Sequence, residues 1–166
     1  LSAARQAGLK TKLNAVVIRG YNDGEVLPLV RWAKQEDMSL RFIEFMPLDG
    51  RGFWSEEKVI RQDEIVDSLK TEFSVNELPR TAEPAQYFQL DGKYQLGIIP
   101  TISRPFCASC DRIRLSATGA LYSCLFSEQG HDLKTPLREG AVDDQLAALV
   151  RQHVWHKEAG YALRPG

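Results

Sequence analysis

The alternation of apolar and polar residues predicts strands and helices in turn along the first part of the chain. Segment 12–18 is nearly all apolar after its polar start, as in a strand buried on both faces, and 40–45 is a second apolar strand. Apolar residues at helical spacing predict a helix between them: Val26, Leu29, Val30 and Ala33. Strand, helix and strand within about 35 residues are typical of a right-handed parallel crossover. A further amphipathic helix is predicted over 63–73, which completes a piece of a larger α/β sheet or barrel.

The pattern changes after residue 73. Apolar segments flank Asp91-Gly92 and, further along, Thr118-Gly119, and each arrangement predicts a β-hairpin. A final amphipathic helix is predicted from apolar residues at helical spacing: Val142, Leu146, Leu149, Val150 and Val154. The second region is therefore expected to be a small antiparallel β region that ends in a helix.

Composition narrows the class of protein. With 166 residues, 43% of them apolar, the chain can bury one substantial core. Its 21 basic and 22 acidic residues leave a net charge of -1, which indicates neither a nucleic-acid nor a membrane partner. Because the chain has no apolar run of about 20 residues and no secretory signal, we expect a cytoplasmic protein.

Three cysteines are the main candidates for chemistry. Cys107 and Cys110 form a C-x2-C pair, and Cys124 follows after 13 intervening residues on the far arm of the second predicted hairpin. Because a hairpin returns to its own start, all three thiolates can converge on one metal centre. Three protein ligands leave a fourth position open, and open positions are where metal sites bind substrates.

Spacing alone leaves the metal undecided. A structural zinc site completed by a histidine is one alternative; His131 is the nearest candidate in sequence, and His153 and His156 lie on the final helix. Three unrelated buried cysteines are another alternative, although C-x2-C is not a random spacing.

Arg112 and Arg114 follow the second cysteine. In a strand, a separation of two residues puts both guanidinium groups on one face, which suits bidentate binding of phosphate or carboxylate. The alternative is a solvated strand edge guarded by charge. Proximity to the cysteines favours an anion site.

A longer motif points to a family. The string F-C-A-S-C-D-R-I-R-L-S-A-T-G at 106–119, continued by Cys124-Leu125-Phe126, resembles the molybdenum-cofactor GTP cyclases, a family of radical S-adenosylmethionine enzymes. Four other stretches agree: Lys12-Leu13-Asn14, the Asn22-Asp23 loop, R-F-I-E-F-M-P at 41–47, and Pro84-Ala85 before Tyr87. The resemblance runs in order from about residue 1 to residue 157.

The resemblance implies roles for particular residues. Cys107, Cys110 and Cys124 would bind a 4Fe-4S cluster whose unligated iron faces the purine of GTP, which favours iron over zinc. The GTP-binding residues that it implies are Lys12, Arg112 and Arg114. Met46 would contact S-adenosylmethionine, and it follows a predicted parallel strand at the end where barrel enzymes place their sites.

Arg41 and Glu44 are charged residues in an otherwise apolar strand, so they need partners or a polar cavity. Arg41 is interpreted as a GTP-binding residue near the phosphates. Pairing of Arg41 with a neighbouring carboxylate is the alternative.

The chain also departs from the family pattern. No cysteine precedes Cys107, so the C-x3-C-x2-C motif that binds and cleaves S-adenosylmethionine is absent, and we expect the chain to be inactive without an N-terminal half. The family usually ends in a Gly-Gly tail, whereas this chain stops at Arg164-Pro165-Gly166, so either the tail is missing or this end differs. Position 111 is Asp where the family usually has Asn, which adds negative charge beside the cysteines.

The expected fold class is α/β. Residues 1–73 would form the C-terminal part of an incomplete (β/α) TIM-like barrel, and 74–166 an antiparallel domain that binds the cluster and GTP. The abrupt start at Leu1 suggests a piece of a longer protein, and exposed sheet edges predict association, with a homodimer as one form. The alternatives are a non-catalytic iron-sulphur or zinc module that binds a partner protein, and an enzyme of another radical family with an auxiliary cluster.

Overall fold

The structure is a computed structural model that describes residues 1–48, 52–155 and 157. It divides the chain into two compact units, Leu1–Pro105 and Phe106–Gly166, and each is described by itself. The predictions that concern His156 and the tail 164–166 lie outside the described residues.

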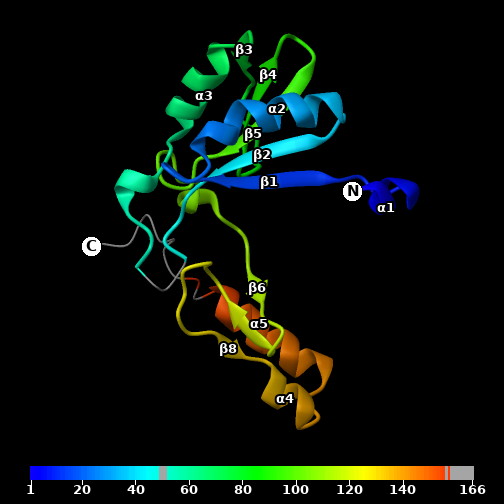
Figure 1. Cartoon of the computed structure of the whole chain (residues 1–166). Coiled ribbons are helices and arrows are strands. Elements are labelled where there is room, and N and C mark those ends of the chain that lie inside the picture. The colour runs from blue at the N-terminus through cyan, green and yellow to red at the C-terminus, as the bar shows by residue number, and fades with distance from the viewer. Residues whose placement is uncertain (49–51, 156, 158–166) are drawn as a thin grey trace. The chain divides into compact units, whose positions relative to one another are not determined.

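The first unit contains a mixed sheet of five strands in the order β1-β2-β5-β4-β3 (Figure 1). Pairing is parallel from β1 to β2 and from β2 to β5, and antiparallel from β5 to β4 and from β4 to β3. The strands are β1 Lys12–Val17, β2 Ser39–Glu44, β3 Val75–Glu77, β4 Gln86–Leu90 and β5 Tyr94–Ile99.

Two longer helices cover one face of this sheet. Apolar side chains of α2 and α3 form a single core with alternate residues of the strands, among them Leu40, Phe42, Leu96 and Ile98. Figure 1 shows α2 lying over β1 and β2. The helical segments of this unit are α1 Ser2–Gln6, η1 Asp23–Glu25, α2 Val26–Gln35, η2 Glu56–Lys58 and α3 Gln62–Lys70.

The other face of the sheet carries polar as well as apolar side chains. Asn14 of β1 pairs with Arg41 of β2, Arg41 pairs with Gly97 of β5, and Gly97 pairs with Tyr87 of β4. Residues that pair in this way share one face, so a polar row crosses four strands. We refer to Asn14, Arg41, Gly97 and Tyr87 as the cross-strand row.

The second unit is smaller and has little core. Its antiparallel sheet has the order β6-β7-β8, and its described part includes the α-helices α4 and α5. Among its described side chains only Leu121 and Ser123 are fully buried. The elements are η3 Cys107–Ser109, β6 Arg114–Leu115, β7 Ala120–Tyr122, β8 His131–Asp132, α4 Lys134–Arg138 and α5 Asp143–Trp155.

The crossover, both hairpins and the final helix are confirmed, but three expectations are not. The described strands form an open mixed sheet and no closed barrel, so the TIM-like barrel is not confirmed. Strand β1 is an edge strand of the described sheet, and Lys12, Asn14 and Val16 on one of its faces are exposed. The division falls after Pro105 and not after residue 73, because the hairpin β4–β5 pairs with β2 and shares its core.

None of the described helices is both long and apolar enough to cross a membrane.

Candidate functional site

The second unit's hairpin places all three cysteines at its open end. Arg114 of β6 pairs with Tyr122 of β7, and the turn lies between these strands. Cys107 and Cys110 precede β6, and Cys124 follows β7 by two residues. The Cys110 amide donates to the Cys107 carbonyl at 3.3 Å, which closes the short turn η3. The predicted hairpin is therefore confirmed, and its two arms carry the cysteines toward the same end.

The thiols themselves are free and half-buried. Within the part of the chain that the structure describes, no three Cys, His, Asp or Glu side chains stand close enough to hold a metal ion. His131 and His153, the described candidates for a zinc ligand, stack on each other with ring centroids 5.6 Å apart. Three cysteines, one of them beside Arg112 and Lys157, are the donor chemistry that suits an iron-sulphur cluster, but the described thiols do not form a closed ligand set.

Positive charge surrounds Cys110. Burial opposes ionisation of its thiol, but hydrogen bonds from the backbone and side chain of Arg112, together with the charges of Arg112 and Lys157, outweigh burial and lower the pKa of Cys110. Lys157 Nζ lies 3.9 Å from Cys110 Sγ. This environment favours the thiolate, which is the form that binds metals.

The arginine pair keeps the alternation that the sequence predicted. Arg112 and Arg114 are half-buried, whereas Asp111, Ile113 and Leu115 between and beside them are exposed. The guanidinium carbon of Arg112 lies 4.4 Å from the centre of the Phe106 ring. A guanidinium stacked in this way keeps its planar edge for an anion.

Arg41 of the first unit has protein partners. Its Nη2 donates to Glu83 Oε2 at 2.8 Å and to the hydroxyl of Tyr87, and the Tyr87 hydroxyl donates to the same Glu83 oxygen at 2.6 Å. The hydrogen bond from Tyr87 is the main cause that lowers the pKa of Glu83; burial opposes it, and the charges of Arg41 and Lys12 lower this pKa further. The alternative of pairing with a carboxylate is therefore observed, while Arg41 Nε is buried with no partner among the described atoms.

Lys12 and Met46 lie where the strand pattern placed them. Lys12 is the exposed first residue of β1, and its charge acts on Glu83, the partner of Arg41. Met46 follows the end of β2 and is half-buried. The predicted site residues are thus divided: Lys12, Arg41 and Met46 belong to the first unit, and the cysteines with Arg112 and Arg114 belong to the second.

The buried carboxylate of Glu44 accepts hydrogen bonds from several donors, as a charged group in an apolar strand requires. Its Oε1 accepts from the Gln62 amide at 2.7 Å and the Ser103 hydroxyl at 2.5 Å, and its Oε2 accepts from the amides of Ile102 and Ser103 at 2.8 Å each. The carboxylate joins β2, α3 and the segment after β5. Its role is structural, and the sequence signal for it was the charge alone.

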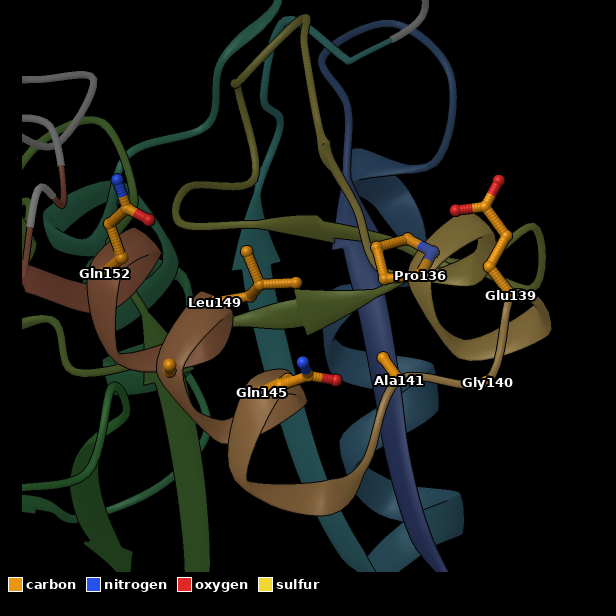
Figure 2. A pocket seen from close by; sticks show the side chains of 8 residues that line it. Pro136, Glu139, Gly140, Ala141, Gln145, Leu149 and Gln152 are labelled. Atoms are coloured by element: carbon orange, nitrogen blue, oxygen red, sulfur yellow. The ribbon is translucent and has the colours of Figure 1, made fainter.

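Sequence reasoning missed two features of the second unit. Lys157 contacts the cysteine segment, and nothing in the pattern near it signalled this. A depression of about 530 Å³ also lies between α4 and α5, where Figure 2 shows Leu149, Gln145 and Pro136 around the hollow. None of the predicted site residues lines this depression, whose lining residues are Pro136, Glu139, Gly140, Ala141, Gln145, Ala148, Leu149 and Gln152.

Comparison with known proteins agrees with the motif. The family model described as Molybdenum Cofactor Synthesis C matches residues 38–163. The GTP 3',8-cyclase of Streptomyces coelicolor is 40% identical over 168 residues, covering 98% of this chain and 49% of the relative. That of Aquifex aeolicus is 44% identical over 133 residues, covering 79% and 41%, and that of Rhodococcus opacus is 40% identical over 167 residues, covering 98% and 47%.

The chain spans about half the length of these relatives. The family model covers most of the chain, including the cysteines and the arginine pair. The chain therefore belongs to the GTP 3',8-cyclase family of molybdenum cofactor synthesis, and it matches the C-terminal half of its relatives.

Proposed function

We propose that this chain is the GTP-binding portion of a GTP 3',8-cyclase, in which Cys107, Cys110 and Cys124 hold a 4Fe-4S cluster. The observation that carries the proposal is the hairpin of the second unit, whose open end holds the three free thiols beside Arg112 and Arg114. A cluster held by thiolates is anionic, and the cations near Cys110 offset that charge. When bound, the cluster supplies an iron with an open coordination position.

The protein's own residues bind and orient the nucleotide. Arg112 and Arg114 present guanidinium groups, whose paired N–H donors match phosphate oxygens. Lys12 and Arg41 provide a second cationic pair on the face of the first unit's sheet that carries the cross-strand row, and a phosphate there would replace Glu83 as the partner of Arg41. Met46 would contact S-adenosylmethionine. Orientation of this kind is the contribution that these residues make to the reaction.

Conversion of GTP to 3',8-cyclo-GTP would need more than this chain. The cysteine motif that cleaves S-adenosylmethionine is not in the sequence. We therefore propose that the N-terminal half of the cyclase is an obligatory partner and that the chain alone is inactive.

The direct test measures iron, sulphide and zinc in anaerobically purified chain and then adds GTP. About four irons per chain and a change in the cluster's absorption on adding GTP are expected. Stoichiometric zinc with no response to GTP would overturn the proposal. Replacement of Cys124 by Ala should abolish iron binding, because it removes one of three ligands.

The arginine pair is tested separately by GTP affinity. R112A and R114A should each weaken GTP binding about 10- to 100-fold, the loss expected when a charge-assisted phosphate contact is removed. Arg138, an exposed arginine of α4, provides the control R138A, which should leave the affinity unchanged. Equal effects of all three replacements would show that only net charge matters and would contradict a defined site.

A second candidate function is a metal-binding module that docks on a partner protein. It is favoured by the apolar side chains that the second unit exposes, namely Leu115, Leu137, Val142 and Trp155. Such a module would keep its metal but show no GTP-dependent change, so the same titration separates the two functions.

A further inference from the structure

Lys157 follows α5 by two residues and reaches back to the cysteine segment. Its Nζ donates to the carbonyl oxygen of Cys110 at 2.6 Å and to that of Arg112 at 3.0 Å, and it lies 3.9 Å from Cys110 Sγ. The lysine is half-buried, as are Cys110 and Arg112. One ammonium group thus contacts the main chain on both sides of Asp111.

The chemistry of an ammonium group suits this position. It has three donors and no acceptor, so it can bind two carbonyls and still present a third N–H toward a sulphur atom. Residues 110–113 have no regular secondary structure, and a lysine bound to their carbonyls compensates for the missing ladder. Both shorter bonds go to main-chain atoms, so Lys157 contacts the backbone of this segment and not the guanidinium group of Arg112.

We propose that Lys157 is a positioning residue of the cysteine site, which holds the segment between Cys110 and Arg112 in place and keeps a fixed positive charge beside Cys110 Sγ. The inference rests on the proposed function, since it assumes that Cys110 ligates the cluster. A cation near a cluster stabilises its reduced, more negative state and so raises the reduction potential. Lys157 then acts on the cluster from a segment outside the cysteine motif.

The test compares four variants of the whole chain with reconstituted cluster. K157M removes the charge and the donors, K157Q keeps a donor without charge, and K157R keeps both. Lys93, an exposed lysine in the turn between β4 and β5, provides the control K93M with the same change in net charge. The readouts are the cluster's midpoint potential and, in metal-free chain, hydrogen exchange of the amides in 107–114.

We expect the midpoint potential to shift to more negative values in K157M and K157Q, and to stay at the wild-type value in K157R and K93M. Amide exchange in 107–114 should become several-fold faster in K157M, with K157R close to wild type. If K157M fails to take up iron, the midpoint potential of K157Q still shows whether the positive charge of Lys157 affects the cluster.

Two failures can be told apart. A wild-type chain that takes up no iron would contradict the proposed cluster. The exchange experiment on metal-free chain would still test whether Lys157 holds the segment between Cys110 and Arg112. A wild-type chain with four irons, whose potential and amide exchange do not change in K157M and K157Q, would overturn the role of Lys157 and leave the proposed function intact.

Discussion

Gly97 has no side chain, and this leaves room for Arg41. In the cross-strand row, Gly97 lies between Arg41 and Tyr87, and a Cβ at this position would be 2.9 Å from Arg41 Cγ and 3.2 Å from Tyr87 Cε1. Both contacts are too short, so a larger residue would displace Arg41 from its partners.

G97A should therefore lower GTP affinity about 10-fold and the free energy of unfolding by about 1–3 kcal/mol, the usual cost of overpacking. Titration with GTP and urea unfolding measure the two effects. Gly24 is the matched control, because a Cβ there would meet nothing within 4 Å, and G24A should change neither quantity. Unaltered GTP affinity in G97A would argue against Arg41 as a ligand of the phosphates.

Tyr94 provides a pH-dependent test of stability. Its hydroxyl donates to the Met38 carbonyl at 2.7 Å, and burial raises the pKa of Tyr94 to about 12. Between pH 10 and 12 the unfolded chain has lost this proton while the folded chain still binds it, so the contribution to stability is complete below pH 10 and falls as pH rises.

Y94F should be less stable than wild type by about 1 kcal/mol at pH 8, because it lacks the hydrogen bond. The difference in urea midpoint should then shrink between pH 10 and 12, since only the wild type loses the contribution of Tyr94. A difference that stays constant over this range would contradict the raised pKa.

At the scale of elements, Glu44 connects strand β2 to helix α3 and to the segment after β5. Both of its carboxylate oxygens accept hydrogen bonds, and three of the four donors are main-chain amides of α3 and of the segment after β5. A glutamine side chain has one acceptor oxygen, so it can accept the hydrogen bonds of only one of the two carboxylate oxygens. Its NH2 group would take the place of the other oxygen and face N–H donors.

E44Q should lower the free energy of unfolding by about 2–4 kcal/mol, the cost of leaving buried partners of a charged group unpaired. Glu57 is exposed and supplies the control E57Q, which should stay within about 0.5 kcal/mol of wild type. Urea unfolding of both variants at one pH measures the difference. Equal stability of E44Q and wild type would show that the hydrogen bonds of Glu44 do not stabilise the first unit.

Elements with a long periodic pattern could be predicted, and short ones could not. The strands around Asp91-Gly92 and helices α2, α3 and α5 follow directly from residue spacing. Strands β3 and β8 are only three and two residues long, so they carry no period, and pairing with a neighbour defines them. The cysteine hairpin was predictable from its turn, whereas Lys157 was not, since an isolated lysine gives no signal of a distant contact.

At the scale of the molecule, local pattern could not assign strands to a sheet. The sequence placed the boundary at residue 73 because the helical pattern stops there, but β4 and β5 bury Phe88, Leu96 and Ile98 in the core of the first unit. An apolar strand face indicates that the strand packs against other elements, but it does not indicate which elements these are.

The outer edge of β1 predicts how the isolated chain behaves. Strand β1 is at the end of the described sheet order, and Val16, on the same face as Asn14, is 38% exposed. Exposed edges of this kind pair with other chains, so we expect reversible self-association. V16K should raise the dissociation constant about 10-fold in sedimentation, and V154K, at an exposed valine of α5, should not. Identical sedimentation of both variants would place the contact elsewhere.

The cross-strand row also has a consequence for the order in which the protein folds. The hairpin that carries Tyr87 and Gly97 closes locally, and the crossover that aligns Asn14 with Arg41 needs only the intervening helix. Arg41 comes to lie beside Gly97 only when β2 pairs with β5. This parallel pairing closes the loop from Leu40 to Leu96, which is longer than the loop closed by the hairpin or by the crossover. Because closing the longer loop costs more chain entropy and parallel pairing is slow, we expect the cross-strand row to assemble last, after the helices have formed.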